Sequence, residues 1–345
     1  LNINLAPNTT YSYWVKAVDA SGNASPKTSQ VRATRNPDRA ASKLRAAACP
    51  APTKTVSNSD ELLAALNAAQ PGTSIWLEPG VYGRGYYMTR SGTAADSIWI
   101  CGSQAAVIDA TLNGQDHGFY LSSVQHVRLA GFSVRNSLKG VMVNDSRHVA
   151  ISDLTVTNTG HEGIHLRANT TDSVVAGNVV RNTGLVEPLY GEGIYIGSSN
   201  KSWCTAQSCV PDRSDRNLIE SNRIYGSTSE GIEAKEGTSG GWIRGNYVEG
   251  TRMHADGLGL IHVRGDDWEV SNNTVANTPS YAISAMTTTY GGKLGFYNQF
   301  FGNSMTGIIP GYGILISVAD STATVACANS APKASSGLTN TVCQR

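Results

Sequence analysis

The sequence has few charged residues and no long apolar segment. Only 15% of its 345 residues are charged and the formal net charge is +1, so it offers no electrostatic basis for binding nucleic acid or anionic membranes. No apolar run approaches the roughly 20 residues that a membrane span requires. Phenylalanine is scarce, at 5 residues, whereas glycine is abundant, at 36. This composition is typical of a turn-rich β protein and argues against a helical bundle.

The sequence also lacks an initiating methionine and a signal peptide, so we expect it to begin after processing or inside a longer precursor. Six cysteines fall into three pairs that are local in sequence. The alternatives are free thiols or a metal site, but no CxxC pair or histidine-rich neighbour supports a metal. We therefore predict an oxidising, extracellular compartment and three disulfides: Cys49–Cys101, Cys204–Cys209 and Cys327–Cys343.

Residues 1–36 differ in character from the rest. Leu5 and Tyr11 resemble the tyrosine corner of a fibronectin type III domain, and DASG at 19–22 resembles its final hairpin turn. The resemblance implies only the last two strands of such a domain, which rarely bury enough surface to be stable alone. Either the chain belongs to a longer one or this hairpin docks on the main domain. Residues 37–52 are interpreted as a linker, and residues 53–345 as the main domain.

The main domain opens with a capping pattern. The segment ELLAALNAAQPG (61–72) fits a short amphipathic helix with an N-cap at Ser59 or Asp60. A PG turn, a strand, a second PG and a tyrosine follow. This order resembles the N-terminal cap and first coil of right-handed parallel β-helix proteins. Such a helix would cover the unpaired strand edges at the end of a solenoid.

One short motif recurs through the rest of the chain at intervals of about 22–27 residues, with one longer gap. A rung of three short strands needs about this length, and it buries its apolar side only against neighbouring rungs. A leucine-rich repeat fold is not supported, because the leucine framework is missing. A β-propeller needs four strands per repeat, which a repeat of this length cannot hold. We therefore predict an all-β, right-handed parallel β-helix. The copies are GFSVRN (131–136), DLTVTN (153–158), GNVVRN (177–182), SNRIYG (221–226), GNYVEG (245–250) and NNTVAN (272–277).

The longer gap contains an insertion at 198–216. Cys204 and Cys209 would close a small loop within it, with Trp203 beside them. Insertions in solenoids emerge on one face and often wall a binding groove. We expect a groove wall here, with surface decoration as the alternative.

A column of acidic residues is predicted where similar short strands stack. The segment SEGIEAKEGTSGG (229–241) is the centre of this pattern, with GHEGIHLRAN (160–169) and GEGIYIGSSN (191–200) as copies and ADGLGLIHV (255–263) as a looser one. Alternation from Ile232 turns Ile232 and Ala234 to one side and Glu233 and Lys235 to the other. Alignment on the glycine after the acid then stacks four carboxylates about 4.8 Å apart: Glu162, Glu192, Glu230 and Asp256.

Like charges at this spacing repel unless a cation, a proton or a basic side chain neutralises them. Five residues are expected beside the acidic column: His165, Arg167, Tyr195, Glu233 and Lys235. A turn carboxylate such as Glu162 can also serve only to accept backbone N–H groups. No partner for His262 can be assigned from the sequence.

From about Cys49 onward the chain resembles secreted members of the pectate-lyase-like β-helix superfamily, through GEGIYIGSS and EGIEAKEGTSGGWIRGN. That superfamily consists mostly of polysaccharide lyases, with glycoside hydrolases, epimerases and phage tailspikes as minorities. The resemblance implies a polysaccharide substrate, with a strand lysine, here Lys235, acting as base beside carboxylate-bound Ca²⁺. Glu192, Glu230 and Asp256 would be the calcium ligands, although the acids here are chiefly glutamates and the usual aspartate-rich pattern is missing.

The leading hypothesis is β-elimination on a uronate polysaccharide, with Lys235 as base and Arg167 neutralising the uronate carboxylate. His165 or Tyr195 would protonate the leaving oxygen. Glu230 and Glu233 act on the charge of Lys235. Substrate contacts are expected from Glu162, Glu192, Trp203 and Asp256.

Two alternatives remain open from the sequence. One is glycoside hydrolysis by paired carboxylates among Glu192, Glu230 and Glu233. The other is a non-catalytic carbohydrate-binding β-helix. In each case we expect a monomer whose partner is a polysaccharide, without nucleic acid or membrane partners.

Overall fold

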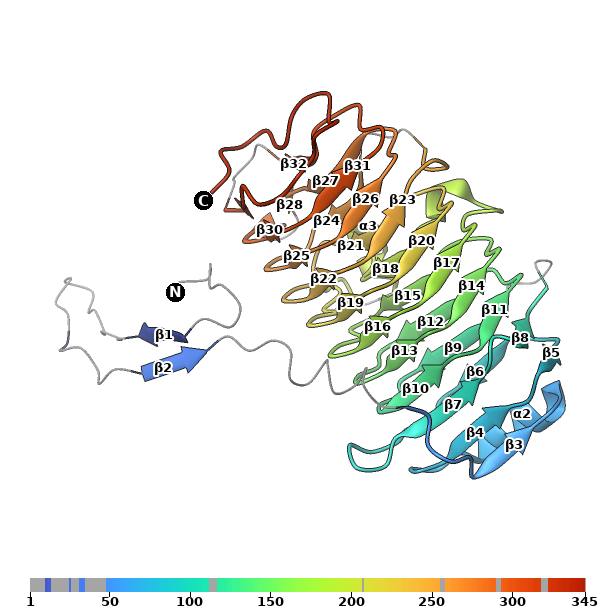
Figure 1. Ribbon diagram of the computed structural model, residues 1–345. Helices are drawn as coiled ribbons and strands as arrows, with labels where there is room; N and C mark the ends of the chain where they lie inside the picture. Colours follow the sequence, from blue (N-terminus) through green and yellow to red (C-terminus); the bar gives the residue numbers. More distant parts are fainter. Residues whose placement is uncertain are drawn as a thin grey trace.

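The computed structural model describes residues 10–13, 25, 31–34, 48–111, 117–206, 208–254, 258–289, 293–317 and 322–344. From residue 48 onward the chain forms a right-handed parallel β-helix, as predicted. Successive rungs stack from the blue end of the chain to the red end (Figure 1). No helix among these residues is long and apolar enough to cross a membrane.

Three parallel sheets form the walls of the solenoid, with eleven strands in sheet 1 and nine each in sheets 2 and 3. Sheet 1 contains β3 (Lys54–Val56), β4 (Ser74–Leu77), β7 (Ile98–Gly102), β10 (Val127–Ala130), β13 (Ala150–Ser152), β16 (Val174–Ala176), β19 (Leu218–Glu220), β22 (Trp242–Arg244), β25 (Glu269–Ser271), β30 (Gln299–Phe301) and β33 (Thr324–Val325). Sheet 2 contains β5 (Gly80–Tyr82), β8 (Ala106–Asp109), β11 (Ser133–Arg135), β14 (Thr155–Thr157), β17 (Val179–Arg181), β20 (Arg223–Tyr225), β23 (Tyr247–Glu249), β26 (Thr274–Ala276) and β31 (Ser304–Thr306). Sheet 3 contains β6 (Tyr86–Met88), β9 (Phe119–Ser122), β12 (Val141–Asn144), β15 (Ile164–Arg167), β18 (Ile194–Ile196), β21 (Ile232–Ala234), β24 (Gly259–Val263), β27 (Tyr281–Ala285) and β32 (Ile314–Ile316).

The core runs along the axis of the solenoid, because every second strand residue points inward. In sheet 3 one inward position is occupied on successive rungs by β-branched residues that are fully buried. Burying such a side chain contributes about 1.5–3 kcal/mol, and no rung can bury it without its neighbours. This column therefore fixes the register of sheet 3: Val141, Ile164, Ile194, Ile232, Ile261, Ile283 and Ile314.

A short helix, α2 (Ser59–Ala68), closes the N-terminal end of the stack (Figure 1). It buries Leu62, Ala65 and Leu66 against the first rung. Its N-cap is Asn58, whose side chain accepts a hydrogen bond from the Glu61 N–H, and not Ser59 or Asp60 as the sequence suggested. The difference is one residue, because any of several adjacent polar side chains could have supplied the cap.

An internal ladder of asparagines accounts for part of the repeat motif. Each ladder amide donates to the side-chain oxygen of the asparagine on the next rung, at 2.9–3.0 Å. The same oxygen accepts a backbone N–H from the rung before it. The asparagines of the repeat thus satisfy buried backbone groups at the turns. The ladder consists of Asn178, Asn222, Asn246, Asn273, Asn303 and Asn329.

The six cysteines pair as the sequence predicted: Cys49–Cys101, Cys204–Cys209 and Cys327–Cys343.

A small two-stranded antiparallel sheet joins β28 (Thr288–Thr289) to β29 (Lys293–Leu294).

The N-terminal segment forms an antiparallel pair, β1 (Thr10–Tyr13) with β2 (Val31–Thr34). Two strands are what the fibronectin type III resemblance implied. Leu5, the turn at 19–22 and most of the proposed linker lie outside the described residues. The division into residues 1–36, 37–52 and 53–345 therefore stays a prediction.

Candidate functional site

The outward side of sheet 3 carries the residues that the sequence singled out. Strands β15, β18, β21 and β24 place His165, Tyr195, Glu233 and His262 at equal positions on four consecutive rungs. Alternation turns these side chains away from the axial core, as expected for Glu233 beside the inward Ile232.

Three members of the predicted acidic column stack on consecutive rungs, and the register of the described residues gives the place beyond them to a glycine. Backbone hydrogen bonds stack Glu162, Glu192 and Glu230, since the N–H groups of Gly163 and Gly193 donate to the carbonyls of Glu192 and Glu230. The next rung pairs Ile232 with Ile261, which puts Gly259 beyond Glu230.

Asp256, the fourth residue of the predicted column, lies outside the described residues. The register follows burial of Ile261 and Val263 over Ile232 and Ala234, which outweighs the acid–glycine pattern used for the alignment.

A cleft of about 660 Å³ opens over this part of sheet 3. Two loops at the two ends of β18 border it. One contains the 3₁₀ turn η1 (Pro188–Tyr190), and the other contains the short helix α3 (Asn200–Ala206) of the insertion. The insertion thus walls the cleft, as predicted. The lining residues are Leu138, Lys139, His161, Glu162, His165, Arg167, Leu189, Tyr190, Glu192, Tyr195, Ser198, Ser199, Lys201, Ser202, Thr205 and Lys235.

At one end of the cleft floor, Glu162 is held by two nitrogen groups. Its Oε1 lies 2.9 Å from Lys139 Nζ and 3.2 Å from His165 Nδ1. Burial opposes ionisation of Glu162, but its contacts with His165 and Lys139 prevail and hold its pKa well below the ordinary value. Burial, together with the Lys139 ammonium, lowers the pKa of His165, whereas the Glu162 carboxylate acts in the opposite direction. Its Nε2 lies 2.9 Å from the carbonyl oxygen of Gly197, which suits Nε2–H as the donor.

Tyr195 and Lys235 lie side by side in the middle of the floor. The Lys235 ammonium is 5.5 Å from the centroid of the Tyr195 ring and 2.7 Å from Glu233 Oε1. Burial works against a charged amine, but the carboxylate of Glu233 outweighs it and raises the pKa of Lys235.

The phenol of Tyr195 also stays protonated. Burial, followed by the surrounding carboxylates, raises the pKa of Tyr195 well above its ordinary value. Its hydroxyl makes no hydrogen bond with the described residues, so it is free to meet a molecule in the cleft.

A buried charged cluster lies beside the floor, on the next two rungs of sheet 3. Glu230, Glu233 and His262 are at most 2% exposed and do not line the cleft. His262 Nδ1 lies 3.2 Å from Glu230 Oε1 and 3.4 Å from Glu233 Oε1, so one imidazole bridges two carboxylates. Arg264 adds a second cation, with its Nε 3.6 Å from Glu233 Oε1 and 3.4 Å from His262 Nε2. Burial and the neighbouring Glu230 raise the pKa of Glu233.

Sequence reasoning missed His262 and Arg264 because their place depends on the register of β24. Counting from Ile261, which has the same alternation as Ile232, would have placed His262 beside Glu233 and Arg264 beside Lys235. Glu230 and Glu233 do stand on the predicted rungs. Both are buried, however, and neither lines the cleft.

Glu192 differs from the other glutamates of the column. It lines the cleft, is 5% exposed, and its Oε2 is buried without a hydrogen-bond partner among the described residues. Burial, followed by the carboxylates of Glu233 and Glu162, raises the pKa of Glu192 well above its ordinary value. Burial among carboxylates thus favours the protonated form of Glu192, which can donate one hydrogen bond into the cleft.

Arg167 contributes a guanidinium group to the lining of the cleft. Its Nε donates to Asn144 Oδ1 at 3.1 Å, and it forms no ion pair within the part of the chain that the structure describes. Arg167 and Lys139 thus bring positive charge to the same cleft as Lys235.

Trp203 does not contact the cleft, contrary to the expectation from sequence. Its ring is fully buried, and its Nε1 donates to the carbonyl of Ser198 at 3.0 Å. The tryptophan anchors α3 to the solenoid, because a side chain at Gly237 would meet its ring within 2.9 Å. A second anchor is the Glu236 carboxylate, which accepts from the Asn200 N–H at 2.8 Å.

Gly197 allows the chain to leave β18 for this insertion. Its φ of 85° lies in the left-handed region, and a side chain there would meet Thr238 within 2.5 Å. The turn also presents the Gly197 carbonyl to His165.

The arrangement of charges does not suit calcium. Ca²⁺ requires six to eight oxygen ligands and unpaired carboxylates. Here Lys235, His262 and Arg264 already contact Glu233, and His262 contacts Glu230. Asp256, the third predicted ligand, lies outside the described residues. Among the described residues, Glu230, Glu233 and His262 form a group that could hold a metal ion, because their ligand atoms lie within 4.8 Å of one another. This group has only two carboxylates, and the side chains of Lys235 and Arg264 adjoin it.

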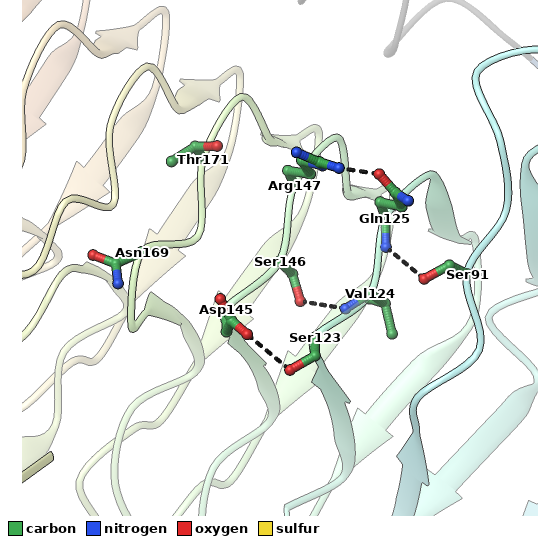
Figure 2. Close-up of a pocket in the computed structure, with 9 residues that line it drawn as sticks. All are labelled: Ser91, Ser123, Val124, Gln125, Asp145, Ser146, Arg147, Asn169 and Thr171. Carbon is green, nitrogen blue, oxygen red and sulfur yellow. Dashed lines mark hydrogen bonds between the residues drawn. The ribbon is translucent and has the colours of Figure 1, made fainter. Parts of the chain in front are cut away.

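A second hollow, of about 320 Å³, lies over the turns that follow β9, β12 and β15 (Figure 2). Its side chains mostly bond to one another, as Ser123 Oγ does to Asp145 Oδ2 at 2.9 Å and Arg147 Nε to Gln125 Oε1 at 2.8 Å (Figure 2). It contains none of the residues that the sequence singled out. The candidate site is therefore the cleft over sheet 3.

Comparison with known proteins agrees with the fold. A family described as the right handed beta helix region matches residues 87–212. No curated protein sequence matches significantly. Among solved structures, an alginate lyase from Paenibacillus sp. str. FPU-7 superposes with a TM-score of 0.74 at 27% identity, over 85% of this chain and 100% of that one.

Two further structures share the fold at lower identity. The pectate lyase Pel9A has a TM-score of 0.58 at 14% identity, over 81% of this chain and 79% of that one. A hyperthermoactive exopolygalacturonase from Thermotoga maritima has a TM-score of 0.52 at 12% identity, over 83% of each chain. The rung architecture and these comparisons together show a right-handed parallel β-helix protein whose structural neighbours include polysaccharide lyases.

Proposed function

We propose that this protein cleaves a uronate-containing polysaccharide by β-elimination in the cleft over sheet 3. The observation that carries the proposal is the pairing of a phenol and an amine, Tyr195 and Lys235, on a floor that also presents Arg167 and Lys139. The resemblance to an alginate lyase supports a uronate as substrate.

The first requirement of the reaction is to neutralise the uronate carboxylate, since only then is the proton on the adjacent carbon acidic enough to remove. Arg167 has no anionic partner among the described residues and can pair with that carboxylate. Glu192, whose raised pKa favours its protonated form, adds a hydrogen-bond donor where an ionised glutamate would repel the substrate.

The chemistry then needs one base and one acid. Lys235, as the neutral amine, takes the proton from the carbon next to the carboxylate. The electron pair forms the new carbon–carbon double bond and the glycosidic C–O bond breaks. Tyr195 donates its proton to the leaving oxygen, a role that suits a phenol whose pKa is raised. His165, held by Gly197 and Glu162, packs against the Tyr195 ring at 4.3 Å between centroids and orients it.

The test uses purified protein with uronate polymers and neutral polysaccharides. β-Elimination creates an unsaturated, ultraviolet-absorbing end on each product, which hydrolysis does not. We expect this absorbance with a uronate polymer only. Lys235→Ala and Tyr195→Phe should each lower kcat by about 10²–10⁴-fold. Lys54→Ala, at an exposed lysine of β3, is the control. Full activity of the Lys235 variant would refute the proposal.

A second candidate, glycoside hydrolysis, is favoured by one observation. Glu162 and Glu192 lie on adjacent rungs, about 5 Å apart by strand spacing, and their pKa values are moved in opposite directions. An ionised and a protonated carboxyl at this separation match a retaining glycosidase. New reducing ends without ultraviolet absorbance, abolished by Glu192→Gln, would support hydrolysis over elimination.

Extracellular action, a monomeric state and a polysaccharide partner belong to the same proposal. Three disulfides support an oxidising compartment.

A further inference from the structure

A loop beside the cleft exposes an unusual amount of apolar surface. Within the apolar loop, residues 184–191, Leu185 is 42% exposed, Val186 59%, Leu189 65% and Tyr190 56%. Leu189 and Tyr190 line the cleft, whereas Val186 does not. Contiguous exposed apolar side chains at the mouth of a polar cleft point to ligand contact.

The apolar loop is held at several points, so its shape is preformed. The N–H groups of Val186 and Glu187 donate to the carbonyl of Gly160 at 3.0 and 3.1 Å. The Thr228 hydroxyl donates to the Pro188 carbonyl at 2.8 Å, and the Tyr190 N–H to the Glu187 carbonyl at 3.0 Å. A loop fixed in this way pays little ordering entropy when it binds.

The ring of Tyr190 lies next to the imidazole ring of His161. The imidazole of His161 lies 5.5 Å from it, between centroids, and both line the cleft. Together they extend the apolar side of the cleft beyond the floor that holds Tyr195 and Lys235.

The other border of the cleft is polar. The insertion contributes Lys201, Ser202 and Thr205 from α3, and the Lys201 side chain is exposed. A sugar ring has an apolar C–H face and a rim of hydroxyl and carboxylate groups. A groove with an aromatic border on one side and a cationic, hydroxyl-bearing border on the other matches an acidic sugar, whereas an apolar protein segment would leave Lys201 unpaired.

We propose that Tyr190 is the stacking platform of a sugar-binding subsite that holds a uronate ring next to the bond being cleaved, with Lys201 on the facing border contacting its carboxylate. The proposal rests on the proposed function, since it names a subsite of the same cleft. Its occupant is a ring of the polysaccharide chain itself, because the apolar loop is continuous with the lining of the cleft.

Binding is measured by calorimetry with a purified uronate oligosaccharide in the inactive Tyr195→Phe background. We expect Tyr190→Ala to weaken binding by about tenfold, as loss of an aromatic stacking contact predicts. Tyr190→Phe should bind as tightly as Tyr190. The matched control is Val186→Ala, which trims an equally exposed residue of the same loop outside the cleft. In the active enzyme Tyr190→Ala should raise KM for the polymer and leave kcat unchanged.

Unchanged affinity of Tyr190→Ala, or an equal loss in Val186→Ala, would overturn the stacking role. Equal binding of a neutral oligosaccharide, with no effect of Lys201→Ala, would overturn the acidic subsite. If the oligosaccharide binds through Tyr190 and Lys201 but no polymer is cleaved, the subsite stands and the catalytic proposal fails.

Discussion

The ammonium of Lys235 lies 2.7 Å from Oε1 of Glu233, a completely buried carboxylate on the rung next to Tyr195. This contact keeps the amine charged in the resting protein, although the proposed reaction needs it neutral. Glu233 therefore positions Lys235 and sets the pH at which it can act as a base.

Replacing Glu233 should shift the pH dependence of activity. Because the carboxylate raises the pKa of Lys235, Glu233→Gln should lower that pKa, and the neutral amine should appear at lower pH. We expect the acidic limb of the kcat/KM profile to move toward lower pH by about one unit or more. Glu220→Gln is the control, since Glu220 pairs with Arg244 in sheet 1, away from the cleft. An unmoved limb would show that Lys235 is not the titrating base.

Glu192 should behave as a neutral acid in substrate binding. Its pKa is raised, so it is protonated below that pKa and becomes a repelling carboxylate above it. Glu192→Gln, which keeps a donor and cannot ionise, should match the wild-type KM near neutral pH. At alkaline pH the KM of the wild type should rise while that of the variant stays level. A variant without any activity would instead favour Glu192 as the acid of a hydrolase.

Removal of divalent cations should leave the activity unchanged. Lys235 and Arg264 already compensate the buried carboxylates and His262 contacts both of them, so a calcium ion would have to displace these side chains. The measurement is the initial rate after dialysis against a chelator, followed by addition of Ca²⁺. A chelator-sensitive rate that Ca²⁺ restores would mean that these side chains rearrange around an ion.

The asparagine ladder should contribute to stability and not to catalysis. Asn246→Ala would leave the backbone N–H and side-chain amide of Asn222 without their acceptor. We expect a loss of about 1–3 kcal/mol in the free energy of unfolding, seen as a lower thermal midpoint. Asn67→Ala, at an exposed position of α2, should change the midpoint little, and both variants should keep their activity. Equal midpoints for the two variants would contradict a structural role for the ladder.

The sequence by itself determined the solenoid and the rungs that carry the site. The asparagines and the inward isoleucines recur at a spacing set within each repeat, so the repeat can be recognised from the sequence alone. The same is true of the sequence-local cysteine pairs and of the alternation that sends Ile232 inward and Lys235 outward.

Only the tertiary structure decided which side chains meet across rungs. The lengths of the turns differ between rungs, so the glycine-based alignment did not give the register of β24. Burial of Ile261 set that register, and it placed His262 beside Glu233. Burial also separated residues of like sequence: Glu192 lines the cleft, whereas Glu230 on the next rung is buried and does not. Trp203 of α3 is fully buried and does not line the cleft. These outcomes depend on packing between segments far apart in the chain, which local periodicity does not encode.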